Sequence, residues 1–140
     1  MAIAGDQLPL KVYAYGRCST CRKALAWLAQ QGLTPGPGLE LIEITTSPPS
    51  RGTLTQALAA LGAIKRLFNT SGQSYRALGA AAVAAMGQDE ALQALAADGK
   101  LIKRPLVFTA QGKVLVGFKP EEWSAPVSYT HLTLPTNSRV

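Results

Sequence analysis

The two cysteines of the chain, Cys18 and Cys21, are separated by two residues at the start of a predicted helix. A thiol in this place lies near the unpaired N–H groups and the positive end of the helix dipole, which favour the thiolate. Arg17, Arg22 and Lys23 add positive charge beside the pair, and cysteine pKa values in such settings fall from about 8.5 to roughly 3.5 to 7.5. We therefore expect Cys18, at the exposed helix entry, to be the nucleophile, and Cys21, one turn further in, to be its partner thiol.

Two other interpretations of this pair are open, a metal site and the chance proximity of two structural thiols. A zinc site needs further Cys or His ligands, and the only histidine is His131, close to the C-terminus. The sequence therefore favours a reactive dithiol, and we expect no bound metal or cofactor.

A second candidate group stands in "LIKRPLVF", residues 101 to 108, where Arg104 precedes Pro105 at the entry to an apolar run. Proline cannot donate a hydrogen bond to a β-ladder, so it marks an edge strand, a first residue or a cis peptide bond. An arginine next to a thiolate would lower the pKa of that thiol and bind an oxyanion with its planar fork. The alternative for Arg104 is a solvated surface side chain.

Strand and helix patterns along the chain predict how these groups are positioned. The order is strand, helix, strand, several helices, two strands and a helix. The predicted elements are strands over 10–15 and 39–44, a helix closed by Gly32, helices after Pro49 and over 75–87 and 89–99, a hairpin around Gly112, and a helix from Pro120. This order predicts an α/β, thioredoxin-like fold with a central mixed sheet and a helical insertion, about residues 50–99, between the second and third strands.

Length and composition predict one domain, over residues 9–125, after a flexible N-terminus at 1–8. The chain has 140 residues, 47% of them hydrophobic and 16% charged, which suffices for one compact core. The absence of a long apolar run predicts a cytoplasmic protein without membrane contact. The net charge of +6 favours anionic substrates or acidic surfaces, while the scattered cations predict no direct contact with nucleic acid.

The last segment, "PVSYTHLTLPTNSRV" at 126–140, is rich in Thr, Ser and Pro and differs in composition from the rest of the chain. It resembles translated sequencing-adapter DNA, so we expect a non-native, disordered tail. Pro126 is expected to end the helix that begins at Pro120.

The motifs together resemble the arsenate reductase-like family that contains the ArsC, Spx, MgsR and YffB proteins. The resemblance rests on Cys18-Ser-Thr-Cys21-Arg-Lys-Ala, on Lys103-Arg104-Pro105-Leu106 and on "GKVLVGFKPEEW", and it covers about residues 9–124. It implies a thioredoxin-like (glutaredoxin-like) fold with a helical insertion and a nucleophile at Cys18. It also implies an anion-binding arginine at Arg104 and a cis peptide bond before Pro105.

The resemblance implies two different functions. One-cysteine arsenate reductases form an arsenate adduct on the first thiol, use glutathione and glutaredoxin, and hold the oxyanion with three arginines. Spx and MgsR proteins use the C-x-x-C pair as a redox switch and bind RNA polymerase. Arg66 and Arg76 are the candidates for further anion-binding arginines here, with a surface position as the alternative for each.

We predict reductase-type chemistry on an oxyanion (arsenate) or a disulfide, with glutathione and glutaredoxin or thioredoxin as the thiol reductant. The alternative prediction is a redox-sensing regulator that binds RNA polymerase.

Overall fold

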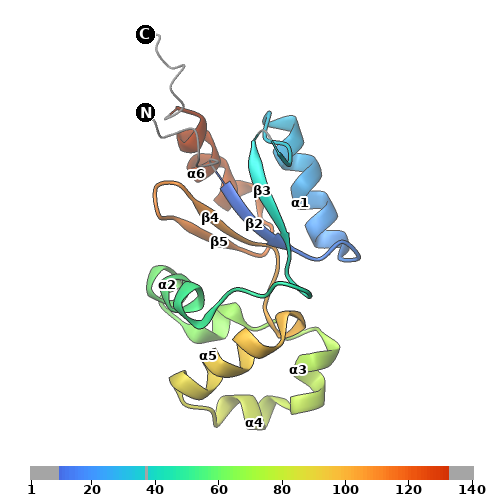
Figure 1. The fold of residues 1–140 in the computed structure, drawn as a ribbon, viewed down its shortest axis with the longest axis vertical. Coiled ribbons are helices and arrows are strands. Elements are labelled where there is room, and N and C mark those ends of the chain that lie inside the picture. Colours follow the sequence, from blue (N-terminus) through green and yellow to red (C-terminus); the bar gives the residue numbers. More distant parts are fainter. Residues whose placement is uncertain (1–9, 37, 133–140) are drawn as a thin grey trace.

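The computed structural model describes residues 10–36 and 38–132 (Figure 1). The expectations for residues 1–8 and 133–140 therefore lie outside the described residues. The elements in chain order are strand β2 (Leu10–Ala14), helix α1 (Ser19–Gln30), strand β3 (Leu39–Glu43), helix α2 (Arg51–Leu61), 3₁₀ helix η1 (Ile64–Leu67), helices α3 (Gln73–Leu78), α4 (Ala80–Ala84) and α5 (Gln88–Ala97), 3₁₀ helix η2 (Gly99–Leu101), strands β4 (Leu106–Thr109) and β5 (Val114–Val116), and helix α6 (Pro120–Leu132).

The strands form one mixed sheet in the order β3-β2-β4-β5. β2 and β3 run parallel, joined through α1, whereas β4 is antiparallel to both β2 and β5. The turn of the β4–β5 hairpin contains Gly112, whose φ of 87° lies in the left-handed region that glycine adopts without steric cost. The predicted α/β fold with a central mixed sheet and a C-terminal hairpin is confirmed.

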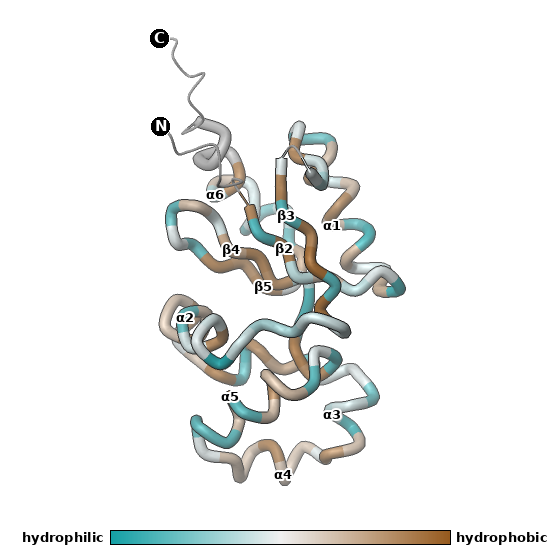
Figure 2. Tube along the Cα trace, viewed as in Figure 1, coloured by the Kyte–Doolittle hydropathy of each residue, from teal (hydrophilic) through white to brown (hydrophobic). Residues whose placement is uncertain are grey.

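Alternate residues of each strand point to opposite faces of the sheet, and each face is covered by its own cluster of apolar side chains. The α1–α6 cluster consists of Leu10, Val12, Ala14, Cys21, Ala24, Leu28, Leu33, Leu39, Val107, Leu115, Trp123 and Val127. Figure 2 shows the hydrophobic colour concentrated on these central strands, with hydrophilic residues more frequent on the helices around them. The site residues thus lie on segments that adjoin a sheet packed from both sides.

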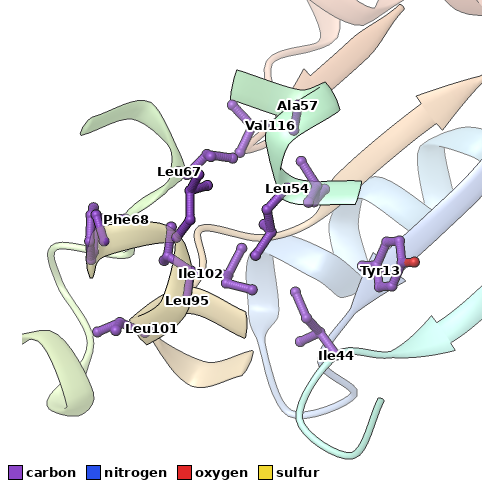
Figure 3. Close-up of a cluster of buried hydrophobic side chains, with 13 residues drawn as sticks. Tyr13, Ile44, Leu54, Ala57, Leu67, Phe68, Leu95, Leu101, Ile102 and Val116 are labelled. Carbon is purple, nitrogen blue, oxygen red and sulfur yellow. The ribbon is translucent and has the colours of Figure 1, made fainter. Parts of the chain in front are cut away.

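Helices α2 to α5 and both 3₁₀ helices form the predicted helical insertion between β3 and β4 (Figure 1). It packs on the sheet through the insertion cluster (Figure 3), which consists of Tyr13, Ile44, Leu54, Ala57, Leu67, Phe68, Ala91, Leu92, Leu95, Leu101, Ile102, Leu106 and Val116. At Gly99 the insertion comes so close to the end of β3 that any Cβ atom would overlap the carbonyl oxygen of Ile44. This close approach fixes the position of the segment that leads from the insertion to Arg104.

The single helix predicted over 75–87 is wrong in detail, because the structure contains two short helices, α3 and α4, in that region. Gly79 separates them with φ 91° and ψ 137°, a conformation that no helix contains. The alanine-rich sequence favours helix on both sides, but the left-handed glycine turns the chain between them.

The expectation that Pro126 ends the last helix is also wrong. α6 continues through Pro126 to Leu132, and Val127 is only 1% exposed. Proline inside a helix costs about 3 kcal/mol or more. Trp123 and Val127 lie four residues apart on the same helix face and are both buried in the α1–α6 cluster, which offsets this cost.

Replacing Val127 by alanine is expected to lower the free energy of unfolding by about 1 to 3 kcal/mol, because a buried side chain loses its contacts. Ser124→Ala is the matched control, since Ser124 is exposed on the same helix and should change stability by no more than about 0.5 kcal/mol. Urea unfolding measures both changes. Equal stability of the two variants would show that the part of α6 beyond Pro126 contributes nothing to the fold.

Candidate active site around Cys18

Cys18 is the N-cap residue of α1, with extended backbone angles of φ −88° and ψ 122°. Its N–H donates to the carbonyl of Tyr15 at 3.0 Å, and its own carbonyl accepts from the N–H of Arg22 at 3.0 Å. The side chain of Cys18 is partly exposed, whereas that of Cys21 is buried, and both are free thiols. The predicted placement, with Cys18 at the helix entry and Cys21 one turn inside, is what the structure contains.

The pKa of the Cys18 thiol lies below its ordinary value of 9.0. Burial is the largest single influence on this pKa and raises it, but the interactions that favour the thiolate together outweigh burial. These interactions come from the backbone N–H and the thiol of Cys21, the backbone N–H of Thr20 and the positive charge of Arg104. The Cys18 side chain accepts no cap hydrogen bond from the described first turn of α1. The N–H groups of this turn therefore favour the thiolate through their partial positive charge, at the positive end of the helix dipole.

Burial, together with the hydrogen bond and the charge of the neighbouring Cys18, raises the pKa of the Cys21 thiol to about 12. The backbone N–H of Tyr15 donates to the Cys21 sulfur at 3.4 Å. Cys18 is therefore the more acidic of the two thiols.

Arg104 precedes a cis peptide bond to Pro105, as the resemblance implies. Its Nη1 donates to the carbonyl of Lys100 at 3.2 Å, and its Cζ lies 5.0 Å from the centroid of the Tyr15 ring. Its Nε is buried and has no hydrogen-bond partner among the described residues. Its positive charge lowers the pKa of both cysteines, which is the direction that the predicted thiolate-stabilising role of Arg104 requires.

A cavity of about 690 Å³ opens beside the Cys18 side chain, between the α1 entry, the insertion and the start of α6. Its wall carries five cationic side chains and one carboxylate, Glu122. The lining residues are Cys18, Thr20, Lys65, Arg66, Phe68, Asn69, Thr70, Ser71, Gly72, Lys103, Arg104, Val116, Gly117, Phe118, Lys119 and Glu122. Such an excess of positive charge around a thiol attracts anions.

The two further arginine candidates have different positions relative to the cavity. Arg66 lies in the cavity wall, whereas Arg76 is not one of the lining residues. Arg76 instead donates from Nη2 to the carbonyl of Ser71 at 2.5 Å. It therefore braces the 69–72 loop that forms part of the wall and does not itself face the cavity.

Sequence reasoning missed the lysines of the cavity wall, Lys65, Lys103 and Lys119. Lys103 and Lys119 stand inside the quoted motifs KRPL and FKPEE, and this position was the signal that could have identified them. Lys119 is also paired with Glu122 at 3.7 Å.

Glu43, at the end of β3, is another residue that the sequence did not single out. Its carboxylate accepts from the hydroxyl of Thr45 at 2.5 Å and from the N–H of Gly16 at 3.3 Å. The pKa of Glu43 is lowered, chiefly by the Thr45 hydroxyl and less by Gly16 and the charge of Arg104. The ionised carboxylate thus ties the end of β3 to the loop that precedes Cys18.

Comparison with known proteins places this site in a family. A family model described as the ArsC family matches residues 13–125. The chain belongs to the ArsC family. It is 41% identical over 118 residues to the uncharacterized protein YusI of Bacillus subtilis, which covers 83% of this chain and 96% of YusI.

Solved structures of other ArsC-related proteins share the fold. A protein from Bacteroides fragilis described as ArsC family related superimposes with a TM-score of 0.77 at 36% identity, covering 85% of this chain and 98% of the other. A protein from Streptococcus mutans described as a possible arsenate reductase superimposes with a TM-score of 0.72 at 38% identity, covering 84% and 99%. The chain is therefore an ArsC-like thiol-redox protein with a thioredoxin-like fold.

Two further properties bear on the ArsC-family site. Among the described residues, no three His, Cys, Asp or Glu side chains are placed to hold a metal ion together. Within the same part of the chain, no helix combines the length and apolar character needed to cross a membrane.

Proposed function

We propose that the protein is a thiol-dependent reductase of an oxyanion such as arsenate, or of a disulfide, with Cys18 as its nucleophile. The observation that carries the proposal is the position of Cys18, a thiol of lowered pKa beside a cavity with five cationic side chains. These charges attract an anionic substrate, and the fork of Arg104 can pair with two of its oxygens. The description of the S. mutans relative as a possible arsenate reductase supports this assignment.

With arsenate, the Cys18 thiolate displaces one oxygen, which leaves as water after protonation, and a sulfur–arsenic bond forms. A second thiol then attacks the Cys18 sulfur. The electron pair of the sulfur–arsenic bond stays on arsenic, which leaves as arsenite, and the two thiols become a disulfide. With a disulfide substrate, the same thiolate attacks one sulfur and releases the other half as a thiolate, and the second thiol then releases the remaining half.

Cys21 is the proposed second thiol. While Cys18 is an anion, its charge and hydrogen bond help keep Cys21 protonated. Once Cys18 is bonded to substrate, both influences disappear and mainly burial opposes ionisation of Cys21. The resulting order is Cys18 first and Cys21 second, after which an external thiol, such as glutathione with glutaredoxin or thioredoxin, must reduce the Cys18–Cys21 disulfide.

The test is a purified-protein assay with arsenate or oxidised glutathione as substrate and glutaredoxin with glutathione, or thioredoxin, as reductant. The expected result is consumption of NADPH, through the coupled reductase of the thiol system, that depends on the substrate and exceeds the rate of the same mixture without the protein. If neither substrate is turned over with either reductant, the reductase proposal is wrong.

Arg104→Lys is expected to reduce turnover about 10- to 150-fold. An ammonium group cannot reproduce the paired hydrogen bonds of the guanidinium, and losing one charge-assisted contact costs roughly 1.5 to 3 kcal/mol. Arg51→Lys is the matched control, because Arg51 lies in the insertion and pairs with Asp89 at 3.3 Å, outside the cavity wall. Equal activity of the two variants would remove Arg104 from the substrate site.

A redox-sensing regulator that binds RNA polymerase is the second candidate function. The observation that favours it is the second thiol, Cys21, whose pairing with Cys18 could report the redox state of the cell. Here a pull-down with RNA polymerase should differ between oxidised and reduced protein, and Cys21→Ala should abolish this difference. Identical binding in both states would leave the reductase as the better account.

A further inference from the structure

Tyr15 contacts all three groups on which the proposed chemistry depends. Its backbone N–H donates to the Cys21 sulfur at 3.4 Å, and its carbonyl accepts from the N–H of Cys18 at 3.0 Å. Its ring centroid lies 5.0 Å from Cζ of Arg104. Tyr15 is partly buried and packs against both the α1–α6 cluster and the insertion cluster, so its ring is a fixed support.

Arg104 has few other fixed contacts. Besides the Tyr15 ring, it has the hydrogen bond from Nη1 to the Lys100 carbonyl, while its buried Nε has no partner among the described residues. No carboxylate of these residues lies within ion-pair distance of Arg104. A long side chain held at one nitrogen keeps much of its rotational freedom, which a flat ring beneath the guanidinium removes.

We propose that Tyr15 is a positioning residue, whose ring holds the Arg104 guanidinium toward Cys18 and leaves its remaining N–H groups for an anionic substrate. This inference rests on the proposed function, in which Arg104 stabilises the thiolate and binds the anion. The ring provides the support and the hydroxyl does not, because the contact with Arg104 is made over the face of the ring.

Other charged groups also act on Cys18 or Arg104, and they are unchanged by a substitution at Tyr15. Those in the cavity wall are Lys65, Arg66, Lys103, Lys119 and Glu122. Arg17 and Arg22 lie beside Cys18 in the chain, Cys21 is its coupled thiol, and the Glu43 carboxylate interacts with Arg104 from the end of β3. Any change caused by a substitution at Tyr15 therefore comes from the ring, acting either through Arg104 or on the cysteine loop directly.

The test measures the rate at which iodoacetamide alkylates Cys18 as a function of pH, followed by mass spectrometry of the labelled peptide. Tyr15→Leu should move the midpoint of the Cys18 profile to higher pH and slow labelling at neutral pH by about 2- to 10-fold, the range expected for losing one cation–π contact. Tyr15→Phe, which keeps the ring, should label like the unchanged protein. Thermal unfolding checks that each variant is folded, and Tyr15→Met replaces Tyr15→Leu if the latter unfolds at the assay temperature.

An Arg104→Met background identifies the route of the effect. If the ring acts through Arg104, Tyr15→Leu should cause no further change in that background. An equal shift with and without Arg104 would overturn the proposal, because the ring would then act on the cysteine loop directly. An unchanged midpoint in Tyr15→Leu, or a Tyr15→Phe variant as impaired as Tyr15→Leu, would overturn it as well.

The alkylation experiment contains no substrate and no reductant, so its outcome does not depend on the reductase assay. If the protein reduces neither arsenate nor a disulfide but Tyr15→Leu shifts the Cys18 profile as described, the proposed function fails and the positioning role stands. If turnover is present and the profile does not move, the positioning role fails alone.

Discussion

Replacing Cys18 by alanine is expected to reduce turnover of arsenate or a disulfide at least about 1,000-fold, because the bond-forming sulfur is removed and the cavity contains no other thiol. Substrate binding should persist, since the five cations of the cavity wall are untouched. The measurement is steady-state turnover, accompanied by equilibrium binding of arsenate.

Cys21→Ala is the matched variant, because it removes the other thiol of the pair, one turn inside α1, while leaving the nucleophile at its N-cap. The first step should survive in this variant. Half of a disulfide substrate should then remain bonded to Cys18 and add its mass to the protein. The unchanged protein should instead accumulate the internal disulfide, without added mass. Full activity of Cys18→Ala, or loss of the first step in Cys21→Ala, would reverse the assigned order of the thiols.

Iodoacetamide is expected to label Cys18 at least about 30-fold faster than Cys21 at pH 7. The pKa of Cys18 lies below 9.0 and that of Cys21 is raised to about 12, so the thiolate fractions differ by at least about 1,000-fold. The more basic Cys21 thiolate is intrinsically the better nucleophile, by roughly 15- to 30-fold for three pKa units, and this partly offsets the difference in thiolate fraction. The difference that remains favours Cys18, and the burial of Cys21 increases it.

The pH dependence of labelling follows from the directions in which the pKa values of Cys18 and Cys21 are shifted. As pH rises, the Cys18 rate should increase and level off above its lowered pKa, below the pH at which an ordinary thiol does so. Cys21 should stay unlabelled until the pH approaches 12 or the protein unfolds. Labelling in denaturant is the control, because both thiols should then react at similar rates. Equal labelling of the folded protein would contradict the assignment of Cys18 as the acidic thiol.

The sequence by itself determined the order of the elements and the identity of the thiol pair. Period-two apolar runs predicted the strands, and the spacing of Cys21, Ala24 and Leu28 on one helical face fixed Cys18 at the entry of α1. The KRPL motif and the resemblance to the arsenate reductase-like family indicated Arg104 and the cis bond before Pro105. These features depend on local geometry, which a short stretch of sequence encodes.

Local patterns failed at two places in the chain. Pro126 signals a helix end, yet burial of Val127 with Trp123 keeps α6 helical beyond it. The alanine-rich run around Gly79 signals one helix, yet the chain turns there. In both cases the propensity of the residues was correct as a tendency, and packing or a left-handed glycine decided the result.

Only the tertiary structure decided which side chains surround Cys18. Lys65 and Lys119 lie far from Cys18 and from each other in the sequence, and they meet in one wall because the insertion and the start of α6 close over the entry of α1. Arg66 and Arg76 looked equivalent in the sequence, but η1 places Arg66 in the wall while Arg76 is engaged with Ser71. The contact between Tyr15 and Arg104 likewise joins the residue after β2 to the segment before β4. These two strands are paired in the sheet, but the two residues are about ninety residues apart in the chain. Such contacts follow from how strands and helices pack, and no local sequence pattern specifies them.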